Sequence, residues 1–181
     1  MRVVAWMAMA LIAAVAGCST LQTSYDFDRG ANFSGLHTYR WVQPIDAKVD
    51  SISDTRIKNA VNNTLTSKGY SEKLSGDVDF LVGYRKKIEH KKELVTTATT
   101  YSYPYSYYRG YYPVYWTTDW QTREFQWDEG TLVLDILDGG GKSVIWQGHA
   151  QAELDHSRTP QQREQLVNMA VNQMLAGFPP K

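Results

Sequence analysis

The fold is decided by a stretch near the middle of the chain, which reads Asp77-Val78-Asp79-Phe80-Leu81-Val82-Gly83-Tyr84-Arg85. Its apolar side chains take every second position, which is the period of a β-strand with one buried face. The extended preference continues through Ile88, Leu94 and Val95, so we expect an arm that projects past the core. Residues 123–127 are the expected returning strand of that arm.

Strands are also predicted on both sides of this stretch. Residues 131–138 place Leu132, Leu134 and Ile136 on one face, and residues 143–152 place Val144 and Trp146 on one face. The glycine-rich turn at 138–142 joins the two segments, which predicts a hairpin. Upstream, residues 25–27 and 36–42 indicate two short strands.

Two amphipathic helices complete the pattern. For the first, Ser53 is the expected N-cap and Gly69 the stop, with a buried stripe of Ile57, Ala60, Val61 and Leu65, while Lys58, Asn59, Asn62 and Asn63 point away from it. For the second, Thr159, Pro160 and Gln162 give an N-cap, a proline at the first helical position and a capping box. Its buried stripe consists of Leu166, Val167, Ala170, Val171, Met174 and Leu175.

The predicted fold class is therefore α+β: an antiparallel or mixed sheet of four to five strands, two helices packed mainly on one face, and a long Tyr-rich hairpin extension. We expect Phe80 and Trp146 to be buried beneath the helices.

The N-terminus predicts a lipid anchor. Arg2, an apolar run and Val15-Ala16-Gly17-Cys18 have the order of a secretory signal, and the run is shorter than the roughly 20 residues that span a bilayer. The last four residues are similar to a bacterial lipobox, whose cysteine receives a diacylglyceryl group with fatty acyl chains such as palmitate. The expected organisation is a signal peptide at 1–17, lipidated Cys18 with a short tether at 18–24, and one α+β domain at 25–181 with an aromatic insertion at about 99–118.

Composition excludes several classes of function. The 19 basic and 19 acidic side chains balance, which is unlike a nucleic-acid binder. Cys18 is the only cysteine, and its expected acylation leaves no free thiol, so a disulfide, a thiolate nucleophile and a Cys-based metal site are all excluded. The four histidines lack the close spacing of a helical metal site, and the acidic pairs Asp128-Glu129 and Asp135/Asp138 fit solvated turns. We therefore expect no catalytic residue, no metal and no cofactor.

The chain's unusual feature is a cluster of tyrosines in the predicted insertion. Eight of the twelve tyrosines lie between residues 101 and 115. Prolines at 104 and 113 disfavour a central strand, and the mixture of Tyr, Ser and Gly is typical of adaptable binding surfaces. The alternative is a low-complexity loop that folds over its own sheet. The candidate interaction residues are Tyr101, Tyr103, Tyr105, Tyr107, Tyr108, Tyr111, Tyr112, Tyr115 and Trp116.

A basic run at 85–92 has two interpretations. It could contact anionic lipid headgroups, or it could pair across the arm with Glu124, Asp128 and Glu129. We favour the pairing because both strands flank the same loop.

Five segments together resemble the domain-of-unknown-function 4136 lipoprotein family. They are the lipobox at Cys18, the aromatic stretch 25–41, the strand 77–84, the hairpin 129–148 and the closing Phe178-Pro179-Pro180. The resemblance implies the fold and a location in the cell envelope, and it implies no activity.

The predicted function is a non-catalytic structural or assembly lipoprotein at the periplasmic face of the outer membrane, where the Tyr-rich loop contacts an envelope protein. Ser19 after the lipidated cysteine resembles lipoproteins exported to that membrane. The alternative is a glycan-binding lipoprotein whose Tyr and Trp rings stack on peptidoglycan or polysaccharide. An enzyme is the least favoured class, and no nucleic-acid partner is expected.

Overall fold

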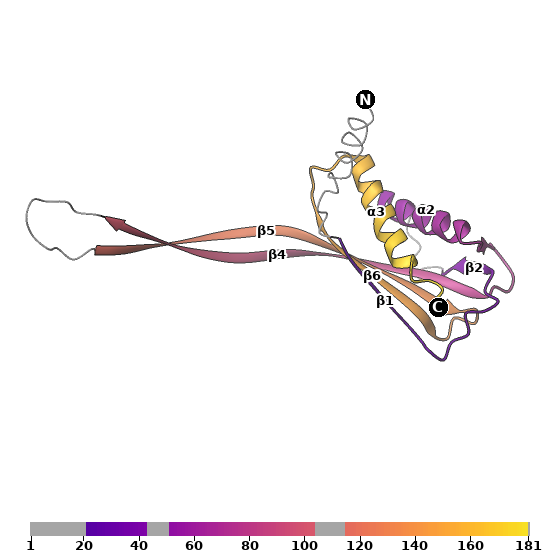
Figure 1. Ribbon diagram of the computed structural model, residues 1–181. Coiled ribbons are helices and arrows are strands. Elements are labelled where there is room, and N and C mark those ends of the chain that lie inside the picture. The colour runs from indigo at the N-terminus through magenta and orange to yellow at the C-terminus, as the bar shows by residue number, and fades with distance from the viewer. Residues whose placement is uncertain (1–20, 43–50, 104–114, 181) are drawn as a thin grey trace, which may run out of the picture.

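The computed structural model describes residues 21–42, 51–103 and 115–180. Its strands are β1 (Gln22–Phe27), β2 (Thr38–Trp41), β3 (Ser71–Glu72), β4 (Phe80–Tyr103), β5 (Tyr115–Asp138) and β6 (Val144–Leu154), and its helices are α2 (Ile52–Ser67) and α3 (Pro160–Leu175). The strands form one sheet in the order β1-β6-β5-β4-β2-β3. Figure 1 shows both helices on one face of this sheet and a long two-stranded arm leaving its end.

The sheet is mixed, and the α+β class is confirmed. Strands β1, β6, β5 and β4 pair antiparallel, whereas β2 pairs parallel with both β4 and β3. The prediction of four to five strands was too low, because the sheet has six strands within the residues that the structure describes. Strand β3 is only two residues long, which is too short to produce a period in the sequence.

The two predicted segments 123–127 and 131–138 belong to one strand. β5 runs unbroken from Tyr115 to Asp138, and β4 is equally long at 24 residues. Gly130 does not interrupt β5, since it sits directly opposite Ile88 in the register. The arm is therefore a direct continuation of two central strands.

Both helices begin with capping boxes. The predicted cap of α3 at Thr159 is confirmed, but α2 is capped by Ser51 and not by Ser53. The Ser51 side chain accepts a hydrogen bond from the Asp54 backbone N–H, and the Asp54 carboxylate accepts one from the Ser51 N–H at 3.0 Å. Asp54 stands three residues after Ser51, which is the spacing that this reciprocal pair requires.

The core lies between the helices and the sheet, and aromatic rings fill it. Phe80 and Trp146 are fully buried, as predicted, and so are the stripe residues Val61 and Val171. Phe178 stands between the two rings, with its centroid 5.7 Å from that of Phe80 and 5.6 Å from that of Trp146. The C-terminal segment therefore closes the core.

Two expectations about side-chain direction were wrong. Val144 is exposed, and Ile145 is buried beside Trp146, because an irregularity in the β5–β6 register falls between Ile136 and Leu137. A bulge of this kind shifts the alternation of faces. Asn62 was expected to point away from the core, yet its Oδ1 accepts hydrogen bonds from Tyr39 Oη and Trp41 Nε1, both at 3.0 Å.

Candidate functional site

The arm comprises residues 92–103 of β4 and 115–126 of β5. Pairing of β6 with β5 stops at Asp128, and pairing of β2 with β4 stops at Val82. Beyond those points β4 and β5 pair only with each other within the residues that the structure describes. At about 3.3 Å per residue, twelve residue pairs carry the arm roughly 40 Å past the sheet (Figure 1).

The arm presents large apolar side chains to solvent on both faces. Leu94 and Trp120 are each 68% exposed, and Phe125 is 51% exposed. The register places Leu94 and Trp120 on the helix side of the ribbon and Phe125 on the opposite side. Threonine pairs Thr96/Thr122 and Thr100/Thr118 lie across the strands with their hydroxyl oxygens 3.0 and 3.2 Å apart.

The two open edges of the arm differ in charge. Residues 94–103 of β4 contain no charged residue, no proline and no glycine, and five of the ten are threonine or valine. Residues 115–126 of β5 carry Asp119, Arg123 and Glu124. Charged side chains on an edge oppose the addition of another strand, whereas an uncharged β-branched edge favours it. The distal β4 edge is therefore the better template for strand addition.

Three side chains of the basic run at 85–92 have the predicted cross-strand partners. Lys92 lies 3.5 Å from Glu124, Lys91 lies 3.4 Å from Glu129, and His90 contacts Asp128. Hydrogen bonds from Lys87 and Lys91 also lower the pKa of Glu89 to about 2. The basic side chains that the lipid-headgroup interpretation would have used are therefore already in contact with carboxylates of this chain.

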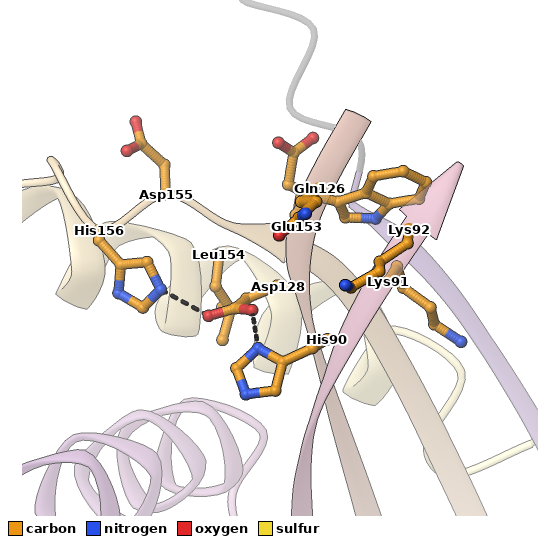
Figure 2. A pocket seen from close by; sticks show the side chains of 10 residues that line it. His90, Lys91, Lys92, Gln126, Asp128, Glu153, Leu154, Asp155 and His156 are labelled. Atoms are coloured by element: carbon orange, nitrogen blue, oxygen red, sulfur yellow. Dashed lines mark hydrogen bonds and ion pairs between the residues drawn. The ribbon is translucent and has the colours of Figure 1, made fainter. Parts of the chain in front are cut away.

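Asp128 links the root of the arm to the loop before α3. One carboxylate oxygen contacts His90 Nδ1, and the other lies 2.6 Å from His156 Nε2 (Figure 2). These two contacts lower the pKa of Asp128, the one with His156 most. The cluster lines an open hollow of about 620 Å³, together with Trp127, Gln126 and Glu153.

Only some of the predicted site residues lie within the residues that the structure describes. Cys18 and Tyr105, Tyr107, Tyr108, Tyr111 and Tyr112 lie outside the described residues. Tyr101 is 49% exposed on β4, and the backbones of Tyr103 and Tyr115 pair with each other near the end of the arm, where Trp116 follows. Leu94 and Phe125 lie in the segments predicted to form the arm, but the candidate interaction residues included neither of them, nor Trp120.

Two kinds of feature are absent from the part of the chain that the structure describes. It contains no group of three or more His, Cys, Asp or Glu side chains placed to hold a metal ion. Neither of its helices is long and apolar enough to cross a membrane.

Together, the helix-covered mixed sheet and the bare hairpin define an α+β protein with a protruding two-stranded arm. The chain belongs to the family described as a domain of unknown function, DUF4136, whose sequence pattern matches residues 23–180. The suspected family is thus confirmed.

Similar solved structures have low sequence identity to this chain. A PDZ domain protein from Parabacteroides distasonis is similar, with a TM-score of 0.52 and 16% identity. The match covers 90% of this chain but only 36% of that protein's chain. A PelC dodecamer variant from Paraburkholderia phytofirmans gives a TM-score of 0.47 at 8% identity, covering 86% of this chain and 95% of PelC. No curated protein matches the sequence.

Proposed function

We propose that this protein is a non-catalytic lipoprotein that uses its arm to bind another protein of the cell envelope. The observation that carries this proposal is that two central strands continue for twelve residue pairs with both edges open and apolar side chains bare. A two-stranded ribbon is at best marginally stable alone in water. A partner strand on the β4 edge would satisfy its backbone groups and cover its side chains.

The position of the arm agrees with a membrane-proximal partner. Strand β1 starts with Gln22 opposite Gln151, and β6 ends three residues later at Leu154, where the arm leaves the sheet. The start of β1 and the root of the arm therefore lie at the same end of the body. With Cys18 acylated and held at the periplasmic face of the outer membrane, the arm would start close to that membrane.

The test is site-specific photo-crosslinking in cells. A photoreactive residue at Leu94 or Trp120 should capture a defined envelope protein, while one at the exposed Glu164 on α3 should not. Replacing residues 94–124 with an Asn-Gly turn should keep the body folded, because Glu93 and Phe125 are directly opposed. Equal capture from Glu164, or none from the arm, would contradict the proposal.

A pair of opposed substitutions tests which edge binds. Thr97 and Gln121 face each other across the arm. Thr97→Lys places a charge on the β4 edge and should abolish capture, whereas Gln121→Lys places the same charge on the β5 edge and should leave it largely intact. The reverse result would assign the partner to β5.

Glycan binding is the second candidate, supported by the hollow at the root of the arm. Trp127, Gln126, Asp128 and Glu153 combine an indole ring with the amide and carboxylate groups that hydrogen-bond sugars. If peptidoglycan fragments protect the fluorescence of Trp127 from quenching, and Glu153→Ala removes that protection, glycan binding is favoured over protein binding.

A further inference from the structure

A second hollow lies on the helix side of the sheet, and its lining is apolar. It has a volume of about 200 Å³ and is bounded by α2, α3 and strands β4, β5 and β6. Ile57 of α2 and Leu166 and Val167 of α3 form its walls. Leu21, just before β1, also lines it. We call this hollow the helix groove.

The groove exists because the residues beneath the helices are small at this end of the sheet. Gly130, Ala150 and Ala152 line it from β5 and β6. A methyl group added at Gly130 would lie 2.9 Å from Leu154 Cδ2, so this position cannot carry a larger side chain without a shift. Ile88 faces the same side and is 62% exposed, which shows that the helices leave apolar surface uncovered here.

The polar groups at the rim are already engaged. The Lys86 ammonium lies 2.6 Å from Asp54 and donates to Ser53 at 2.8 Å, and the Lys87 ammonium is bound to Glu89. A charged or hydrogen-bonding ligand would have to break these contacts. The lining therefore fits an unbranched hydrocarbon chain, which gains only from the burial of apolar surface.

The position of Leu21 identifies the source of such a chain. Cys18 precedes Leu21 by three residues, and three Cα steps of 3.8 Å reach at most about 11 Å. We propose that the helix groove binds one of the fatty acyl chains carried by Cys18. This inference rests on the acylation of Cys18 in the proposed function. The docked chain would fix the body, and with it the arm, in one orientation relative to the anchor.

The test uses the full protein and its own lipid. Cells are supplied with a 16-carbon fatty acid bearing a terminal diazirine, so that the probe enters the lipid on Cys18, and the purified protein is irradiated and digested. We expect crosslinks from the lipidated N-terminal peptide to the α2 and α3 peptides that contain Ile57 and Leu166. Crosslinks confined to phospholipid, or scattered over the arm, would overturn the proposal.

Two neighbouring substitutions on β6 provide the matched comparison. Ala152→Phe fills the groove and should reduce the crosslink yield about tenfold. Gln151→Phe adds the same ring to the opposite face of the sheet and should leave the yield unchanged. Equal crosslink yields in the two variants would overturn the proposal. If Ala152→Phe fails to fold, the positions of the crosslinks in the wild-type protein test the proposal instead.

The intact mass of the mature protein distinguishes a failure of the lipid anchor from a failure of the groove proposal. A mature protein without acyl mass would overturn both the anchor and the groove assignment. An acylated protein whose diazirine never reaches α2 or α3 would overturn the groove assignment alone and leave the proposed function standing.

Discussion

The body and the arm share strands β4 and β5, yet apolar side chains are buried in the body and exposed in the arm. In the body, Trp146 on β6 is fully buried between the sheet and α3. In the arm, Trp120 on β5 is 68% exposed, although it belongs to the same sheet. Backbone pairing thus continues where burial stops. The difference indicates that the body is stabilised from within, whereas the arm, on the proposed function, is stabilised by a bound partner.

The largest contrast is expected between two tryptophan substitutions. Trp146→Ala should lower the free energy of unfolding by about 3–5 kcal/mol, because it removes a buried ring and leaves a cavity. Trp120→Ala should change it by less than about 0.5 kcal/mol, since its side chain is 68% exposed. Urea unfolding followed by circular dichroism measures both. Similar losses in the two variants would show that the arm contributes to the core.

A smaller loss is expected at Asn62, which joins α2 to β2. Its amide oxygen accepts from Tyr39 and Trp41, and its Nδ2 donates to Glu72 at 2.9 Å. Asn62→Ala leaves the fully buried Tyr39 without its hydroxyl partner and should cost about 1–3 kcal/mol. Its exposed neighbour gives the control, and Asn63→Ala should have little effect on the unfolding midpoint.

Stability should also fall in acid through Asp54. Burial raises the pKa of Asp54, but hydrogen bonds from Lys86, Ser51 and Tyr84 lower it by more, so the net shift is downward. The ionised form therefore favours the fold above about pH 4, and this contribution declines as the pH falls from about 4 toward the lowered pKa of the native state. Asp54→Asn should cost about 1–2 kcal/mol at pH 7 and flatten the acid dependence of the melting temperature. An unchanged acid profile in the variant would contradict this role.

The smallest effect on the body is expected at the root of the arm. Asp128→Asn weakens the contacts with His90 and His156 without changing the shape of the side chain. The unfolding midpoint should stay the same, while trypsin should cleave faster after Lys91 and Lys92. A lowered midpoint would mean that the root belongs to the cooperative core.

Sequence patterns predicted the body well because its strands and helices alternate apolar and polar residues. They failed where one residue breaks the period, as with the bulge that exposes Val144, and where a polar side chain turns inward, as with Asn62. Ser51 was missed as a cap because Ser53 offers the same chemistry two residues later. Patterns cannot predict the open edges of the arm, because edges depend on which strands pair across the sheet.

The most direct test of the contrast between a stable body and a marginally stable arm is native-state hydrogen exchange along β4 and β5, measured on the purified mature protein without a partner. Both strands cross from body to arm, so each serves as its own control. Amides at 80–88 and 130–137 should exchange only through near-global unfolding, whereas those at 94–103 and 115–124 should exchange orders of magnitude faster. Uniform protection along both strands would contradict the account, because it would mean that the arm is stable without anything bound to it.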